Sequence, residues 1–326
     1  MRAAAARILV LSRHRPDANL RRACILPMRV LRWRVCAILS VCVFARAWAG
    51  TLTIATYNLE NYTAANRLTE FGYRRDYPKP ESEKDAVRAT LRDLNADVIF
   101  FQEIGSAGYL EELQRDLRTE GIDYPHAWCA DANDPDRKLA VLSRIRWNEA
   151  KAHRDLTFRY FGEMVPVKRG LLEVRFATAL GEVTVFAVHL KSRFSDRPDD
   201  VGSEIRRNGE ATAIRDRILQ LRAEPEADLF LVVGDFNDGR HGRAVQRFLK
   251  KGKRELAISL PATDSRGHTW THAHRKSDTY SRVDHVLVSP ALFPSVREGR
   301  ARIFDGETVA AASDHRPVMA TIGWRD

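Results

Sequence analysis

The chain has 326 residues and carries 53 basic and 43 acidic side chains, a formal net charge of +10. Residues 1–49 hold ten arginines and one aspartate, so the other 277 residues, with 43 basic and 42 acidic side chains, are nearly neutral. This distribution excludes a broadly basic surface of the kind that binds nucleic acid through its overall charge, and the length allows one large domain or two small ones.

The N-terminal segment has the pattern of an export signal. Three arginines lie in residues 28–34, an apolar run follows over residues 35–45, and Ala47-Trp48-Ala49 provides a cleavage sequence. Cleavage there would make Gly50 the first residue of the mature chain. The alternative, a membrane anchor, is disfavoured because the apolar run is too short to cross a bilayer. We therefore expect export to the periplasm or the extracellular space, without stable membrane insertion.

Residues 1–27 are rich in arginine and irregular, and we interpret them as an extension upstream of a true start at Met28. The expected organisation is a signal peptide over residues 1–49, which includes this extension, and one domain over residues 50–326. A single domain is favoured because its polar clusters, described below, are spread along nearly its whole length. The domain retains only Cys129, so it cannot form an internal disulfide.

Apolar, β-branched runs alternate with stretches of helical spacing along this domain. Strands are predicted at residues 52–57, 97–102, 139–143, 171–177, 183–189, 229–234, 283–288 and 317–322. Helices are predicted around Val87, Leu91 and Leu94, around Leu110, Leu113 and Leu117, and from near Ser203 through Ala211, Ile214, Ile218 and Leu221.

The connections refine this picture. The strands at residues 171–177 and 183–189 flank Gly181, which predicts an antiparallel hairpin. Residues 63–83 are polar and predict an irregular loop close to the site. Several strands are too continuously apolar to leave one face in water, so we expect sheets that are covered on both sides. The sequence thus predicts an α/β protein with mixed sheets.

Short polar clusters stand at the ends of the apolar runs. The clusters are Asn58, Gln102-Glu103, His189 with Lys191, Asp235 with Asn237, Asp284, and Ser313-Asp314-His315. Each cluster alone could be a cap or a turn. Six such ends, all rich in Asn, Asp, Glu and His, are hard to explain as six independent turns. They predict one polar site at a sheet edge, where side chains at alternate positions of an extended segment point the same way.

The residue types in these clusters favour a hard metal ion and a phosphate ester. The domain has no thiolate cluster and no HExxH sequence, so a structural zinc site is not expected. Carboxylate and amide oxygens suit magnesium, which keeps positions for water and phosphate oxygens. The domain also lacks a serine in a nucleophile elbow and a glycine-rich phosphate loop. Metal-assisted attack of water on a phosphate ester fits these groups best.

In this order, the clusters resemble the endonuclease/exonuclease/phosphatase superfamily, which includes pancreatic-type deoxyribonucleases, abasic-site endonucleases, inositol-phosphate 5-phosphatases and bacterial sphingomyelinases. The motifs are short individually but specific as an ordered set, and the resemblance covers residues 51–324. It implies an α/β fold of the DNase I-like type, a four-layer sandwich in which two packed mixed β-sheets are flanked by helices. It also places the site at one edge of that sandwich.

The resemblance implies a role for each cluster, beginning with the metal. Glu103 would be the main magnesium ligand, with Asn58 beside it and Asp314 available to the metal cluster. Manganese or calcium are the alternative ions.

The remaining implied roles concern the phosphate and the water. Asp235 would orient or deprotonate the attacking water, and Asn237 would hold a phosphate oxygen. His315, oriented by Asp284, would bind or protonate the phosphate. His189 would add a further phosphate contact, although some family members carry tyrosine at its position.

For several other polar residues the sequence allows both a functional and a structural role. Lys191 and Arg169 would contact substrate phosphate or form ordinary salt bridges. His285 should point to the opposite face of its strand from Asp284 and be structural. Four histidines lie in the sequence around Trp270, and they form either a second metal site or a polar loop; they are His241, His268, His272 and His274.

These expectations combine into a functional hypothesis. The chain should be an exported, magnesium-dependent phosphodiesterase, most simply an endonuclease or exonuclease on DNA or RNA, that acts as a monomer without a protein partner. The alternative is a phosphatase or a sphingomyelinase-like phosphodiesterase of the same superfamily, and a remote one is a non-catalytic binding protein. The lipid alternative needs an apolar membrane hairpin, for which residues 158–161 offer a candidate, although a buried strand is the simpler interpretation.

Overall fold

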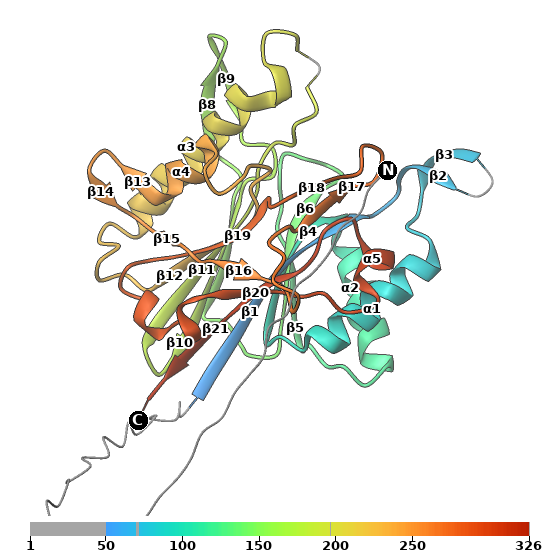
Figure 1. Ribbon diagram of the computed structural model, residues 1–326, viewed down its shortest axis with the longest axis horizontal. Coiled ribbons are helices and arrows are strands. Elements are labelled where there is room, and N and C mark those ends of the chain that lie inside the picture. Colours follow the sequence, from blue (N-terminus) through green and yellow to red (C-terminus); the bar gives the residue numbers. More distant parts are fainter. Residues whose placement is uncertain (1–49, 70–71, 196, 326) are drawn as a thin grey trace, which may run out of the picture. The chain divides into compact units, whose positions relative to one another are not determined.

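The computed structural model describes residues 50–69, 72–195 and 197–325 (Figure 1). The predicted signal peptide, residues 1–49, lies outside the described residues. Within them, no helix combines the length and apolar character needed to cross a membrane.

Two mixed β-sheets form the centre of the fold. The first has the order β16 (Ala262–Thr263), β20 (Ala301–Ile303), β21 (Val318–Trp324), β1 (Gly50–Tyr62), β4 (Val98–Ile104), β6 (Lys138–Ser143) and β5 (His126–Cys129). The second has the order β15 (Ile258–Ser259), β19 (Asp284–Val288), β12 (Phe230–Asp235), β11 (Gly181–His189), β10 (Leu171–Thr178) and β7 (Glu149–His153). In each sheet one central pair is parallel, β1 with β4 and β11 with β12, and their outer neighbours β21, β6, β10 and β19 are antiparallel to them.

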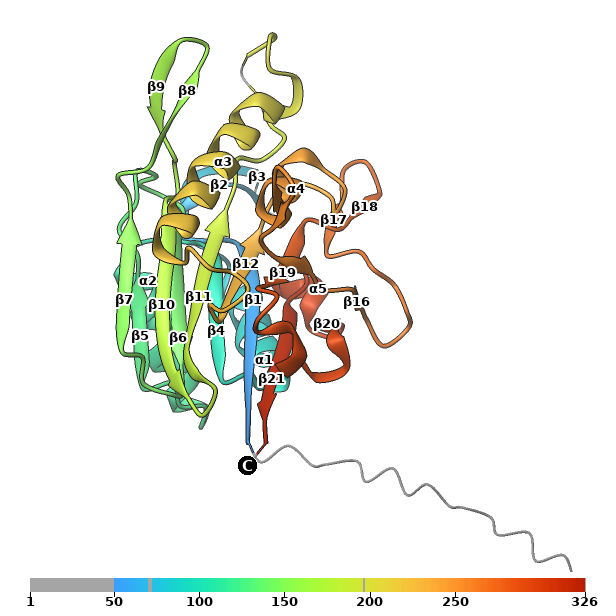
Figure 2. The same ribbon diagram turned by 90° about the vertical axis from the view of Figure 1, so that its left-hand side faces the viewer.

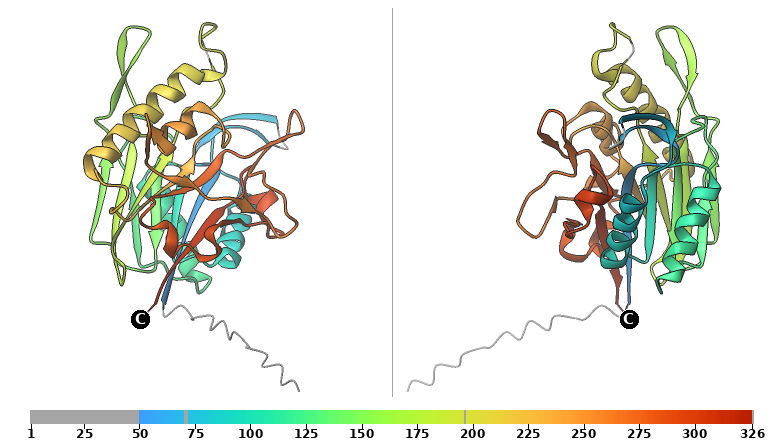
Figure 3. Two further views of the ribbon diagram at one scale, coloured as in Figure 1. Left: turned by 60° about the vertical axis from the view of Figure 1, so that its left-hand side comes forward. Right: turned by 90° about the vertical axis from the view of Figure 1, so that its right-hand side faces the viewer.

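Helices cover the outer face of each sheet. On the first sheet lie α1 (Glu81–Leu94), α2 (Ala107–Thr119) and α5 (Val309–Ala312), and on the second lie α3 (Glu204–Leu221) and α4 (Arg243–Leu249) (Figures 1 and 3). Figure 3 shows these helices on opposite sides of the paired sheets. The short 3-10 helices are η1 (Val201–Ser203), η2 (Phe293–Ser295) and η3 (Arg297–Gly299).

Three apolar clusters hold the layers together. One lies between the sheets and joins residues such as Ile54, Phe100 and Val185. A second joins the first sheet to its helices, and a third joins the second sheet to α3 and α4. Because successive strand residues point to opposite faces, both faces of each central strand are buried. The predicted four-layer α/β sandwich is therefore confirmed.

All eight predicted strands and all three predicted helices occur, with ends shifted by a few residues. The predicted hairpin across Gly181 is also present, as the antiparallel pair β10–β11. The expectation of an irregular loop over residues 63–83 was wrong. That segment contains a two-stranded hairpin, β2 (Ala65–Thr69) with β3 (Gly72–Tyr77), and the start of α1. Side chains of β3 are all exposed, so the apolar alternation that marks a strand is missing.

Three further hairpins extend from the sandwich. They are β8 (Thr157–Tyr160) with β9 (Glu163–Pro166), β13 (Lys250–Lys251) with β14 (Arg254–Glu255), and β17 (His272–His274) with β18 (Thr279–Ser281). In β8, Phe158 and Tyr160 are buried in the α3 layer, as the buried-strand interpretation expects, whereas Phe161 at the turn is exposed. Figure 2 shows the β8–β9 hairpin rising beside α3.

Candidate active site

The predicted site residues come together where β1, β4, β11 and β12 end. The pairs β1–β4 and β11–β12 are both parallel, and the two sheets pack so that the carboxyl ends of these four strands lie at one edge (Figure 2). The backbone changes course there: Glu103 and Asn237 both have left-handed conformations, with φ of 59° and 50°. Asparagine tolerates this region, but glutamate rarely adopts it, and strained residues of this kind cluster at functional sites. Both conformations turn a polar side chain out of the sheet ladder.

Asp235, at the end of β12, is the most heavily supported carboxylate. Its Oδ1 accepts a hydrogen bond from the backbone N–H of Asn237 at 2.8 Å. Its Oδ2 accepts two more at 3.1 Å, from the side-chain amides of Asn58 and Asn237. The Asn237 amide also donates to the Leu190 carbonyl at 2.9 Å. The two predicted amides therefore orient Asp235, and Asn58 joins the first sheet to the second.

The surroundings of Asp235 favour its protonated form. Burial, followed by the nearby charge of Asp284, raises the pKa of Asp235 to about 7. A carboxylate with a pKa near neutrality is suited to accept a proton during a reaction, because its acid and base forms are both accessible.

His315 and Asp284 form a buried pair. His315 Nδ1 lies 2.9 Å from Asp284 Oδ2, and the other oxygen, Asp284 Oδ1, is buried without a hydrogen-bond partner. Burial alone would lower the pKa of His315, but the charge of Asp284 and the hydrogen bond to it outweigh burial, so its pKa is raised well above the ordinary value. The imidazole is therefore a cation, with Nε2 turned toward Asp235 at 3.9 Å and Asp314 at 4.0 Å.

His189, at the end of β11, lies between two predicted carboxylates. Its Nε2 is 3.7 Å from Glu103 Oε1 and 3.7 Å from Asp235 Oδ2, and its Nδ1 has no hydrogen-bond partner. Burial, followed by the positive charge of Arg169, holds the pKa of His189 well below its ordinary value. This imidazole is neutral at pH 7 and can accept or donate one hydrogen bond.

Acidic and imidazole groups are placed for a metal ion. Among the described residues, Asp235, Asp284 and His315 form one group whose ligand atoms lie within 4.8 Å of one another, and His272, Asp314 and His315 form another. The orphaned Oδ1 of Asp284 is a free buried acceptor, which fits a site that gains a cation.

Glu103, the predicted main ligand, stands outside both groups. Its Oε2 accepts the backbone N–H of Asn61 at 3.0 Å and lies 3.9 Å from Arg137 Nε. Its Oε1 faces His189 and is not held by a hydrogen bond from the backbone. Carboxylate oxygens arranged in this way fit a hard divalent cation.

The two predicted substrate contacts are held by other groups. The Lys191 ammonium donates to Ser192 and to the Phe194 carbonyl, within its own loop. Arg169 is 93% buried, and its Nε lies 3.0 Å from Asp134 Oδ2. The positive charges of both side chains act on His189 and lower its pKa, with the larger effect from Arg169.

Several residues that support the site were not predicted from the sequence. The Thr271 hydroxyl accepts the backbone N–H groups of Val283 and Asp284, each at 3.1 Å, and so fixes the start of β19. Glu60 accepts the backbone N–H of Asp314 at 2.8 Å. A lone threonine or glutamate carries no local signal of such a role, because the partners are far along the chain.

The four histidines around Trp270 separate in the structure. His268 pairs with Asp264, and His274 lies against Ser277. His272 faces the site: its Nε2 is 3.5 Å from Asp314 Oδ2 and its ring centroid is 4.5 Å from that of His315. His285 points away, toward the Asp238 carbonyl, and packs on Phe236, as expected of a structural residue.

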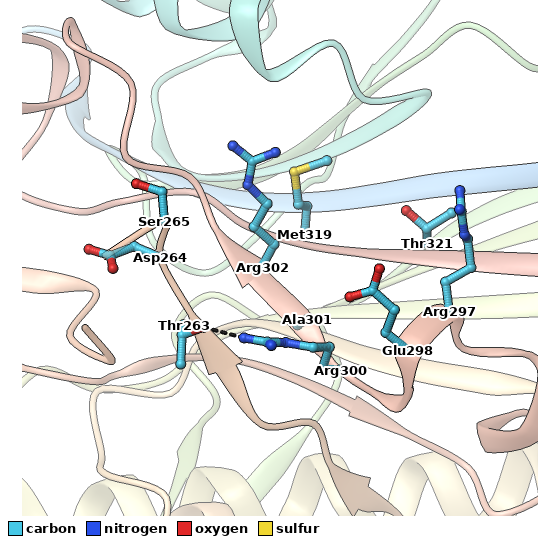
Figure 4. Close-up of a pocket in the computed structure, with 10 residues that line it drawn as sticks. All are labelled: Thr263, Asp264, Ser265, Arg297, Glu298, Arg300, Ala301, Arg302, Met319 and Thr321. Atoms are coloured by element: carbon cyan, nitrogen blue, oxygen red, sulfur yellow. Dashed lines mark hydrogen bonds between the residues drawn. The ribbon is translucent and has the colours of Figure 1, made fainter. Parts of the chain in front are cut away.

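The larger of two cavities described here lies away from this site. A cavity of about 500 Å³ at the edge of the first sheet contains none of the predicted site residues, although Arg297, Arg300 and Arg302 line it (Figure 4). A smaller one, of about 170 Å³, borders Asp314 and is lined in part by Arg266, Arg275 and Trp270.

Comparison with known proteins agrees with the fold. The structure is similar to those of endonuclease/exonuclease/phosphatase family proteins from Bacteroides thetaiotaomicron (19% identity, TM-score 0.57, covering 85% of this chain and 99% of that one) and Leptotrichia buccalis (14%, 0.57, 84% and 100%). It is also similar to sphingomyelinase C from Streptomyces griseocarneus (15%, 0.57, 84% and 100%). At these identities the likeness establishes the fold. No curated protein matches the chain.

The sequence itself settles the family. The pattern of the Endonuclease/Exonuclease/phosphatase family matches residues 55–315, which include every predicted site residue from Asn58 to His315. This chain belongs to the endonuclease/exonuclease/phosphatase family, whose fold is the DNase I-like α/β sandwich.

Proposed function

We propose that this chain is a metal-dependent phosphodiester hydrolase that acts on DNA or RNA. The observation that carries the proposal is the position of Asp235: a buried carboxylate, oriented by Asn58 and Asn237, between a neutral and a cationic imidazole. A carboxylate base with a neutral imidazole at 3.7 Å and a cationic imidazole at 3.9 Å supplies the groups that water attack on a phosphate needs.

The proton transfers follow from the protonation states. Asp235, held by three N–H donors, orients the attacking water and accepts its proton. His315 binds a phosphoryl oxygen through Nε2–H or gives that proton to the leaving oxygen, while Asp284 holds the ring by Nδ1. His189, being neutral, places one further hydrogen bond on the phosphate. Asn237 acts through Asp235, since both hydrogens of its amide are already engaged.

The proposed cation is magnesium, with manganese or calcium as alternatives, held by Glu103 and Asp314. A divalent cation at this edge would polarise a phosphoryl oxygen and offset the charge that develops on it. Glu103 lies on β4, and Asp314 lies in the loop before β21. Two carboxylates suit magnesium, which takes few protein carboxylates.

The nucleic-acid substrate is supported by the cavity beside Asp314. Its lining includes the guanidinium groups of Arg266, Arg275 and Arg316, which offer phosphate pairing, and Arg316 also lies over the ring of Trp270. Arg169 is proposed as a long-range source of positive charge, and Lys191 as an organiser of its own loop. Export from the cell and action as a monomer are parts of the same proposal.

A lipid phosphodiester is the second candidate, because apolar side chains are exposed near the β8–β9 turn. Phe161 and Met164 at that turn are 46% and 59% exposed, and Phe194 and Val201 in the adjoining loop are 79% and 83% exposed. The ring of Phe161 lies under Arg197 of the same loop, so the two segments present one surface. Exposed apolar groups on a projecting hairpin are typical of a surface that meets a bilayer.

Purified protein decides among these substrates. We expect magnesium-dependent cleavage of plasmid DNA or RNA and of bis-p-nitrophenyl phosphate, lost on chelation and in Glu103→Ala. Glu182→Ala, an exposed carboxylate on β11 away from the site, is the matched control and should retain the activity. Cleavage of sphingomyelin alone would support the lipid candidate instead. Cleavage of p-nitrophenyl phosphate alone would indicate a phosphatase. Metal-independent cleavage that Glu103→Ala retains would contradict the proposal.

A further inference from the structure

We propose that His272, Asp314 and His315 form a binding site for a transition-metal ion of the zinc class. This site shares Asp314 with the proposed hard-cation site at Glu103 but differs from it in having two imidazole ligands. The backbone builds this group. His272 of β17 and His315 form an antiparallel bridge, so their side chains leave the paired segments next to each other. Hydrogen bonds from Ala273 N to the Asp314 carbonyl at 2.9 Å and from Arg316 N to the Thr271 carbonyl at 2.7 Å hold the bridge on both sides.

The ligand atoms already face one another. His272 Nε2 is 3.5 Å from Asp314 Oδ2, His315 Nε2 is 4.0 Å from Asp314 Oδ1, and the three ligand atoms lie within 4.8 Å of one another. In a tetrahedral zinc site with bonds of about 2.0–2.1 Å, ligand atoms are separated by roughly 3.3 Å. Small side-chain rotations would therefore bring the three groups onto one ion.

The chemistry of the group selects the class of ion. Two imidazoles and one carboxylate are the donors of zinc and its neighbours, whereas magnesium and calcium take oxygen ligands. His315 also has the outer support of a metal-ligating histidine, because its Nδ1 is hydrogen-bonded to Asp284 and leaves Nε2 for the ion. Binding would displace the proton from Nε2 into solvent.

The site is open to ions from solution. The side chains of His272 and Asp314 are 22% and 27% exposed, in contrast to the buried His315. Three protein ligands leave a fourth tetrahedral position for water. The neighbouring histidines have other partners: His268 lies 3.2 Å from Asp264, which Arg316 also contacts, and His274 lies against Ser277.

Occupation of this site would oppose the proposed hydrolysis. The ion would take His315 Nε2, the atom proposed to meet the phosphate, and one oxygen of Asp314. We therefore expect zinc to inhibit the magnesium-dependent reaction, an expectation that rests on the proposed function. The binding itself does not depend on that function.

Direct binding tests the proposal without an activity assay. Chelator-treated protein is titrated with Zn²⁺ by calorimetry, and with Co²⁺ to record the intense visible absorption of a four-coordinate ion. Wild-type protein should bind one ion, and His272→Ala should bind at least about tenfold more weakly, as expected for the loss of a metal-holding group. His268→Ala removes a histidine that also pairs with an aspartate but has no second imidazole beside it, and should bind like wild type.

The outcomes separate the two proposals. Equal Zn²⁺ affinity in wild type and His272→Ala, or no binding by wild type, would overturn the zinc-class site, whatever the protein hydrolyses. If His272→Ala does not fold, His272→Gln gives the same comparison with a polar side chain of similar length. Zinc binding without any phosphodiesterase activity would instead retain this site and refute the proposed function.

Discussion

The surroundings of His315 and of His189 differ in one respect that decides their chemistry. Both imidazoles are buried at the same edge of the sandwich, and both face carboxylates. His315 has the carboxylate of Asp284 at 2.9 Å, whereas the nearest carboxylates to His189 are at 3.7 Å and Arg169 adds an opposing charge. The pKa therefore rises well above its ordinary value at His315 and falls well below it at His189.

This contrast shows that burial alone does not set the charge of a histidine. Desolvation disfavours the cation at both positions, and only a carboxylate within hydrogen-bond distance reverses that effect. The cationic His315 and the neutral His189 lie on either side of Asp235. His315 can therefore act as an acid, and His189 as a hydrogen-bond donor. Four measurements test this difference between His315 and His189.

Loss of the positively charged His315 imidazole should have the largest effect on activity. His315→Gln keeps a hydrogen-bond donor near Asp284 but removes the charge and the transferable proton. We expect kcat/KM for bis-p-nitrophenyl phosphate to fall by about 100- to 10,000-fold, the usual contribution of general acid–base catalysis. Circular dichroism would show that the variant is folded, and a folded variant with wild-type activity would refute the role of His315.

Removal of the partner carboxylate should make His315 resemble His189. In Asp284→Asn the imidazole keeps a polar neighbour but loses the charge, so burial should dominate and lower the pKa of His315. We expect activity to fall by about 10- to 100-fold, as for groups that orient a functional histidine. Titration of the His315 ring by NMR would measure the shift, and an unchanged pKa would contradict the explanation of the contrast.

The raised pKa of Asp235, which lies between the two histidines, should make the stability of the metal-free protein depend on pH. Because the folded pKa of Asp235 is about 7, above its ordinary value, the folded state binds more protons than the unfolded state between those two pKa values. The free energy of unfolding should therefore fall as the pH rises across that range, and level off above about pH 7. Denaturant unfolding at several pH values, compared with Asp235→Asn, should show a shallower fall in the variant; parallel curves would refute the raised pKa.

Replacement of the neutral histidine should have the smallest effect. His189→Gln retains one hydrogen-bond donor without a charge, which is close to what a neutral imidazole supplies. We expect a loss of about fivefold, equivalent to roughly one imperfect hydrogen bond of about 1 kcal/mol. Steady-state kinetics would measure it, and a loss as large as that of His315→Gln would show that His189 carries a charge or a proton in the reaction.

The layers of the fold were predictable from the sequence, and so was a set of candidate residues for the site. Continuous apolar runs mark buried strands because burial is a property of each segment, and all eight predicted strands occur. Ordered polar clusters next to the apolar runs predicted Asp235, Asp284 and His315 as site residues, since a polar side chain that follows an apolar run must sit at a sheet edge. The β2–β3 hairpin was missed because its exposed side chains provide no apolar alternation.

The pairing of these groups could not be predicted, because it depends on contacts between distant parts of the chain. Asn58 and Asp235 are 177 residues apart, and their hydrogen bond exists because two separate sheets pack with their carboxyl ends at one edge. The position of His272 against His315 likewise depends on a bridge between a hairpin and a distant loop. Charge states depend on such distances: one carboxylate at 2.9 Å makes His315 a cation, while burial leaves His189 neutral, and no local pattern in the sequence distinguishes the two.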